Sequence, residues 1–135
     1  MSVLNKKMSI RSELTAARSV EDRLLEEAAR CGYGAAALFA IKLALEEALN
    51  NAIKHGNRMD PNRAVQVHFS VDGDRTEISI FDEGAGFDPS QVPDPTADEN
   101  LEKPCGRGIM LMRAYMDEVR YNPRGNQVYM MKRKT

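Results

Sequence analysis

The chain has no tryptophan, two cysteines, two histidines and only 6% aromatic residues among its 135 positions. Cys31 and Cys105 lack the spacing of metal ligands, so neither a disulfide framework nor a zinc site is expected. Two histidines also exclude a site built from several histidine ligands. The longest apolar run, residues 35–41, is far too short to cross a bilayer, and the first residues lack the apolar core of a signal peptide.

The chain also lacks an excess of charge of either sign, since its formal net charge is −1. No general field therefore attracts nucleic acid or an anionic membrane, and we expect a cytoplasmic protein that contacts neither directly. The chain also lacks the G-x-x-x-x-G-K-[ST] phosphate loop and the six-residue dinucleotide fingerprint. A nucleotide site, if present, must have another design.

The hydrophobic pattern predicts one α+β domain over residues 1–135, with a mixed, mostly antiparallel sheet covered on one face by helices. Alternation predicts strands, and runs rich in Leu, Ala and Glu predict helices. The expected strands are residues 8–14, 65–71, 76–81, 118–121 and 127–132, and the expected helices are 18–31, 35–55 and 109–115. Residues 88–105 contain four prolines and predict a long loop, which in a compact domain is usually functional.

The longest predicted helix carries the stretch LEEALNNAIKHG, with two carboxylate–amide pairs at i, i+4. Glu46 pairs with Asn50, and Glu47 pairs with Asn51. An apolar stripe is expected to face the sheet, namely Leu38, Ile41, Leu45, Leu49 and Ala52. The polar cluster opposite it is either a solvated helix face or a site. Two adjacent asparagines favour a site, because Asn is a poor helix former and its amide oxygen suits Mg²⁺.

Two glycine-rich stretches complete the pattern. In IFDEGAGFD, Asp82 follows a predicted strand, where its carboxylate is able to accept a hydrogen bond from an exocyclic amine, and the glycines allow close approach to the backbone. The alternative is a simple turn. In GRGIMLM, Gly106 and Gly108 precede a predicted helix, whose free N–H groups and dipole suit phosphates. The alternative there is a plain loop-to-helix joint.

In this order, EALNNAIKHG, DEGAGF and GRGIMLM resemble the N-box and two glycine boxes of the GHKL ATPases, which share the Bergerat ATP-binding fold. The resemblance extends from residue 35 to the C-terminus. It implies a two-layer α/β sandwich with residues 88–105 as the ATP lid. The stretches NAIKHG and GRGIMLMRAYMDEVRY are similar to bacterial anti-sigma-factor serine/threonine kinases.

That resemblance implies roles for three side chains. The family pattern Glu-x-x-x-Asn-Ala-x-x-His-Gly selects Glu47 as general base and Asn51 as the Mg²⁺ ligand, in place of Glu46 and Asn50. Asp82 would accept the adenine amine. The resemblance implies further nucleotide contacts from Gly84 and Gly86 near the base and from Gly106 and Gly108 near the phosphates. Three cations are suggested as phosphate contacts, namely Lys54, Lys103 and Arg107.

The chain departs from the family at the last hairpin. The family commonly has threonines after a glycine there, and they help to fix the adenine. Here Gly125 is followed by Asn126 and Gln127. Either side chain is able to replace the hydrogen bonds of the missing hydroxyl.

The implied activity is ATP- and Mg²⁺-dependent transfer of phosphate to a serine or threonine of a STAS-domain anti-sigma-factor antagonist. The family also sequesters a sigma factor and is often dimeric, so residues 8–30 are the expected homodimer interface. Two alternatives stay open. One is a nucleotide-binding partner-switch module with little kinase activity, and the other is a detached histidine-kinase-type catalytic domain.

Overall fold

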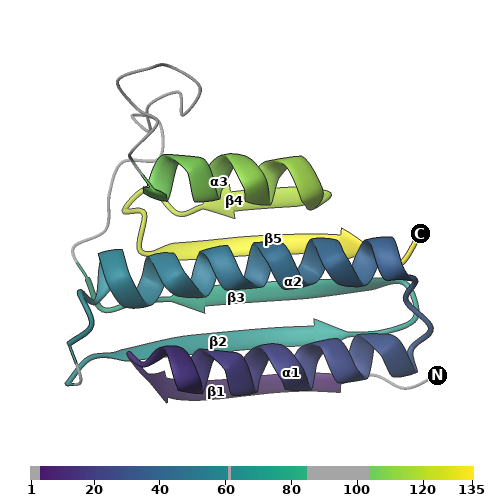
Figure 1. The fold of residues 1–135 in the computed structure, drawn as a ribbon, viewed down its shortest axis with the longest axis horizontal. Coiled ribbons are helices and arrows are strands. Elements are labelled where there is room, and N and C mark those ends of the chain that lie inside the picture. The colour runs from purple at the N-terminus through teal and green to yellow at the C-terminus, as the bar shows by residue number, and fades with distance from the viewer. Residues whose placement is uncertain (1–3, 61, 85–103) are drawn as a thin grey trace.

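In the part of the chain that the structure describes, five strands form one antiparallel sheet, and the helices cover one of its faces (Figure 1). The computed structural model describes residues 4–60, 62–84 and 104–135, with side chains omitted for 104–107. The strands are β1 (Leu4–Arg11), β2 (Ala64–Val71), β3 (Arg75–Phe81), β4 (Glu118–Tyr121) and β5 (Gln127–Arg133). The helices are α1 (Leu14–Arg30), α2 (Ala35–Asn50), the π-helix η1 (Asn51–Gly56) and α3 (Pro104–Tyr115). This arrangement confirms the α+β two-layer sandwich.

The strand order is β1-β2-β3-β5-β4, and every described pairing is antiparallel. α2 lies between α1 and α3 across the middle of the sheet (Figure 1). The predicted stripe on α2 is confirmed for Ile41, Leu45, Leu49 and Ala52, which are buried, while Leu38 is only partly buried. Small side chains on α2 let its neighbours approach closely, and these are Ala37, Ala40, Ala44 and Ala48.

Element boundaries differ from the sequence-based expectation at several places, among them the first helix, which begins at Leu14 and not at residue 18. The first strand begins four residues earlier than expected, because Lys6 occupies a position on the helix-covered face and masks the apolar alternation. The long helix changes to π-type geometry at Asn51. The last helix begins at Pro104, so Gly106 and Gly108 lie inside its first turns and not ahead of it. Proline suits a first helical position because its missing N–H would have no partner there.

Among the described residues, no helix combines the length and the apolar character that a membrane span needs.

One acidic side chain is buried between the first two helices. Glu21 of α1 faces Glu46 and Lys42 of α2, and Asp22 lies next to it in sequence. Burial raises the pKa of Glu21 to about 7, the Glu46 carboxylate adds to the rise, and the Lys42 charge opposes it. The folded protein therefore retains a proton that the unfolded chain releases above its ordinary pKa.

Replacing Glu21 by Gln should stabilise the protein at alkaline pH. Between an unfolded pKa of 4.5 and a folded value of about 7, the wild type loses stability as pH rises. Glu21→Gln removes this loss, so its free energy of unfolding should exceed that of the wild type by about 2 kcal/mol at pH 8. Urea titrations at pH 5 and pH 8 measure the difference. The exposed Glu26→Gln on the same helix is the control, and parallel pH profiles for wild type and Glu21→Gln would contradict the assignment.

Candidate functional site

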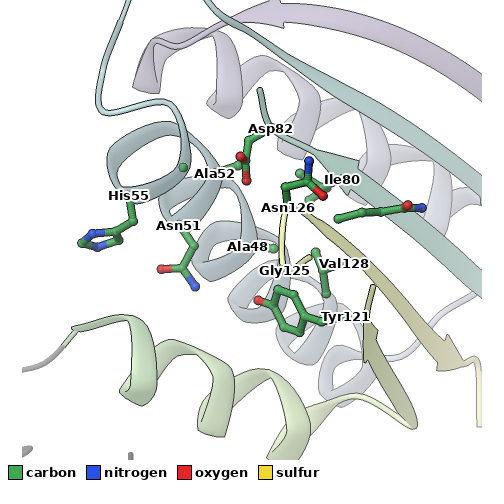
Figure 2. A pocket seen from close by; sticks show the side chains of 12 residues that line it. Ala48, Asn51, Ala52, His55, Ile80, Asp82, Tyr121, Gly125, Asn126 and Val128 are labelled. Atoms are coloured by element: carbon green, nitrogen blue, oxygen red, sulfur yellow. The ribbon is translucent and has the colours of Figure 1, made fainter. Parts of the chain in front are cut away.

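A cavity of about 120 Å³ opens where the end of α2 and η1 meet the ends of β3, β4 and β5 (Figure 2). Its apolar wall includes Ala48, Ala52, Ile80 and Val128. Polar groups gather around that wall, and they are Asn51, His55, Asp82, Tyr121, Asn126 and Gln127, with Gly56 and Gly125 completing the lining. An apolar slot with a few polar groups suits a flat ring that carries hydrogen-bonding atoms at its edge.

The helix that borders the cavity changes geometry there. Asn51–Gly56 form a π-helix, and the Asn57 N–H donates to the Ala52 carbonyl at 2.8 Å. Arg58 and Met59 follow with φ values of 53° and 59°, a left-handed conformation that is uncommon for residues other than glycine. Single π turns and strained residues concentrate at functional sites. Tertiary contacts have to maintain such a conformation, and Asn57 supplies them.

Asn57 is fully buried and joins four segments through its side chain. Its Nδ2 donates to Ser12 Oγ and to the Ala64 carbonyl, each at 2.9 Å, and its Oδ1 accepts from the Glu83 N–H at 2.7 Å. Ser12 Oγ in turn donates to the Arg63 carbonyl at 2.7 Å. The end of η1 is thereby fixed to the β1–α1 junction, the start of β2 and the segment after β3.

Glu83 has a structural role that the sequence did not reveal. Its carboxylate accepts a hydrogen bond from the Ala64 N–H at 2.9 Å, at the first residue of β2. Its two hydrogen-bond partners, Asn57 and Ala64, are distant from it in sequence, so no local sequence pattern could have indicated these contacts.

Asp82 is held against two glycines. Its Oδ1 accepts the Gly84 N–H at 2.8 Å. A β-carbon added at Gly56 would lie 2.3 Å from Asp82 Cγ, and one added at Gly84 would lie 2.0 Å from the Gly56 carbonyl oxygen. Gly84 therefore requires glycine because it meets the Gly56 backbone, and at Gly56 a side chain would displace the Asp82 carboxylate.

The electrostatic setting of Asp82 supports a ligand-binding role. Burial raises the pKa of Asp82 above its ordinary value, while the Gly84 N–H and the Arg63 charge act in the opposite direction. A carboxylate that is shielded from water and lines a cavity is a candidate for ligand recognition.

Glu47 and Asn51 converge beneath α3. A β-carbon added at Gly108 would lie 2.8 Å from Glu47 Oε2 and 3.3 Å from Asn51 Nδ2. Both residues are half-buried, which favours a site over a solvated helix face. Among the described residues, Asn51 Nδ2 is buried without a hydrogen-bond partner. The other pair, Glu46 and Asn50, instead lines a groove between α1 and α2.

The remaining predicted residues fall into two groups. Lys54 is exposed on η1, and Gly106 and Arg107 lie in the first turn of α3. Gly86 and Lys103 lie outside the described residues, as does the predicted lid up to residue 103. The structure therefore brings Glu47, Asn51 and Gly108 together near Asp82, and their roles toward a nucleotide stay predictions.

The chain is similar to known proteins over most of its length. The family model of the histidine kinase-like ATPase domain matches residues 10–132. The chain therefore belongs to the histidine kinase-like ATPase domain family. Three relatives are similar in sequence over about 70% of the chain: the serine-protein kinase RsbW of Bacillus subtilis, the serine/threonine-protein kinase BtrW of Bordetella bronchiseptica and the anti-sigma F factor of Oceanobacillus iheyensis.

The identities are 38% over 69% of this chain for RsbW, 34% over 72% for BtrW and 34% over 70% for the anti-sigma F factor. The matched part spans 62%, 70% and 68% of these relatives, respectively. A crystal structure of the RsbU and RsbW domains of a Mycobacterium tuberculosis protein matches 96% of this chain and 32% of that one, with a TM-score of 0.60 at 19% identity. This likeness supports the fold alone.

Truncating Asn57 should destabilise the protein strongly. Asn57→Ala leaves the Glu83 N–H and the Ala64 carbonyl without their side-chain partner at a partly buried place. We expect a loss of about 2–4 kcal/mol in the free energy of unfolding, measured by urea titration. Asn62→Ala, at an exposed position nearby, should change it by less than about 0.5 kcal/mol. Equal losses in the two variants would show that the network contributes little.

Proposed function

We propose that this protein is an ATP-dependent protein serine/threonine kinase that also acts as an anti-sigma factor. The observation that carries the proposal is the convergence of Glu47 and Asn51 beneath Gly108, beside the cavity that Asp82 lines. Family membership supports ATP use, and the relatives named as serine-protein kinases and anti-sigma factors support the activity.

ATP would bind with its base in the cavity of Figure 2 and its phosphates toward α3. Asp82 accepts the adenine amine, and Gly84 and Gly86 flank the base. At the other end, Gly106 offers a backbone N–H in the first turn of α3, where the helix dipole favours anions, and Gly108 follows in the next turn beside Glu47. Lys54, Arg107 and Lys103 are the cations assigned to the phosphates.

Asn51 would hold Mg²⁺ through its amide oxygen, with phosphate oxygens and water as the other ligands. The residues fit this role, because the Asn51 amide is half-buried, stands beside the Glu47 carboxylate and has a buried Nδ2 without a partner among the described residues. Among the described residues no hydrogen bond holds Nδ2, so this group leaves the amide oxygen available to a ligand. When bound, Mg²⁺ neutralises charge that develops on the transferring phosphoryl group.

Glu47 would act as the general base. Its carboxylate takes the proton of a serine or threonine hydroxyl while the hydroxyl oxygen attacks the γ-phosphorus of ATP. The bond from that phosphorus to the β–γ bridging oxygen breaks, and ADP leaves with the electron pair. Gly108 permits this arrangement, because a β-carbon there would lie 2.8 Å from Glu47 Oε2 and would displace the carboxylate.

The proposed acceptor is a STAS-domain anti-sigma-factor antagonist, and the proposed second partner is a sigma factor. Residues 8–30 are the proposed homodimer interface. β1 supports this, because it is an edge strand with one side paired to β2 and the other side open within the described residues.

Replacing Glu47 by Gln should abolish phosphoryl transfer and leave ATP binding intact. Glu47→Gln keeps the shape and removes the proton acceptor, so kcat should fall about 100-fold or more, while calorimetry gives an unchanged Kd for Mg-ATP. The matched control is Glu46→Gln, one position along the same helix and outside the cavity. Undiminished transfer by Glu47→Gln would refute its role as the base.

The chemical stability of the product separates serine/threonine kinase activity from a detached histidine-kinase domain. The assay uses labelled ATP and the STAS-domain antagonist encoded nearest to this protein. Acid-stable label supports serine or threonine as the acceptor, whereas acid-labile label supports histidine. Tight ATP binding without label transfer would favour the partner-switch module with little kinase activity.

A further inference from the structure

We propose that Asn126, held in one orientation by Asn122, selects adenine over guanine by donating a hydrogen bond to the adenine ring nitrogen N1. The inference rests on the proposed function, since it names the discriminating residue of the proposed ATP site. Asn126 and Asp82 then read the two adjacent atoms of one edge of the base.

The orientation of both amides follows from one backbone N–H. The Gln127 N–H is necessarily a donor, and it lies 3.2 Å from Asn122 Oδ1. Asn122 must therefore point its Nδ2 the other way, where it donates to Asn126 Oδ1 at 2.8 Å. With Oδ1 occupied in this way, Asn126 presents its Nδ2 as the group that remains for a ligand.

Asn126 and Asp82 stand on the same wall of the cavity. The Asp82 N–H donates to the Asn126 carbonyl at 3.0 Å, so their backbones are adjacent, and both side chains appear together in Figure 2. Gln127 also lines the cavity, but successive side chains of a strand point to opposite faces and its neighbour Val128 is buried against the helices, so the Gln127 side chain points away from the helix-covered face. Of the two residues that could replace the missing threonine, the structure thus assigns the contact to Asn126.

The two side chains offer an acceptor next to a donor. Asp82 Oδ1 is occupied by the Gly84 N–H, so Oδ2 remains to accept, while Asn126 Nδ2 donates. Adenine has the matching order, with a donating amine at C6 and an accepting N1. Guanine reverses it, with an accepting oxygen at C6 and a donating N1–H. The ring nitrogen N7 is an acceptor in both bases, so a contact to N7 could not distinguish adenine from guanine. A contact from Asn126 to N1 does distinguish them.

Exchanging the two residues should exchange the base preference. In the double variant Asp82→Asn with Asn126→Asp, the Gly84 N–H still occupies one oxygen at position 82. Asn122 still occupies one oxygen at position 126. A donor then remains at position 82 and an acceptor at position 126, which match guanine. We expect the wild type to bind ATP about 10- to 100-fold more tightly than GTP, and the double variant to reverse that ratio, as measured by calorimetry with Mg²⁺ present.

Single variants and analogues keep the test decisive if the double variant does not fold. Asn126→Ala should weaken ATP about tenfold and leave GTP unchanged, and Asn122→Ala should reduce the ATP-to-GTP ratio by freeing the Asn126 amide. Asn5→Ala, on the far edge strand, is the matched control and should retain the wild-type ratio. With the wild type, 1-deaza-ATP should bind about tenfold more weakly than ATP, and 7-deaza-ATP equally well.

The outcomes separate this inference from the function on which it rests. A wild type that binds neither nucleotide refutes the proposed ATP site itself. A wild type that binds ATP but binds 1-deaza-ATP equally well, or an Asn126→Ala variant with an unchanged ratio, refutes only the role of Asn126.

Discussion

The buried amide of Asn57 is the contact on which the site depends. An asparagine side chain without water must have its donors and acceptor satisfied, and here partners from three other segments do so. The requirement fixes where η1 ends relative to the sheet. That position in turn brings Gly56 against Asp82 and places the π turn beside the cavity. The strained φ angles of Arg58 and Met59 are tolerated because this network determines the path of the chain on both sides of them.

Small residues then set the distances within the site. Gly56 and Gly84 let the helix end touch the segment after β3, and Gly108 lets α3 approach the helix that carries Glu47 and Asn51. Each of these contacts joins segments that are far apart in sequence. The glycine boxes therefore act here as spacers between packed elements as well as candidate ligand contacts, and the two roles are compatible because close packing also exposes backbone groups.

Most of the elements could be predicted from the sequence, because the spacing of apolar residues along the chain reflects which side chains of a helix or strand are buried. β2 and β3 alternate strictly, and their predicted limits were within one residue of the structure. The π turn was missed because its side-chain pattern continues that of α2, and only its hydrogen bonds differ. Asn57 and Glu83 were missed for another reason: their partners Ser12 and Ala64 are distant in the chain, and a single sequence carries no signal for such pairs.

The pairing of β1 with β2 has a consequence for how the chain folds. The partners Leu4 and Val71, like Arg11 and Ala64, are more than fifty residues apart, with both α1 and α2 between them. Closing so long a loop is entropically unfavourable before the helices have formed, so we expect this ladder to form late and to slow folding. Its Arg11–Ala64 end lies beside the Ser12–Asn57–Ala64 hydrogen bonds, which hold the loop closed. We therefore expect the edge strand to pair with the sheet first at its Arg11–Ala64 end, next to Asn57 and the end of η1.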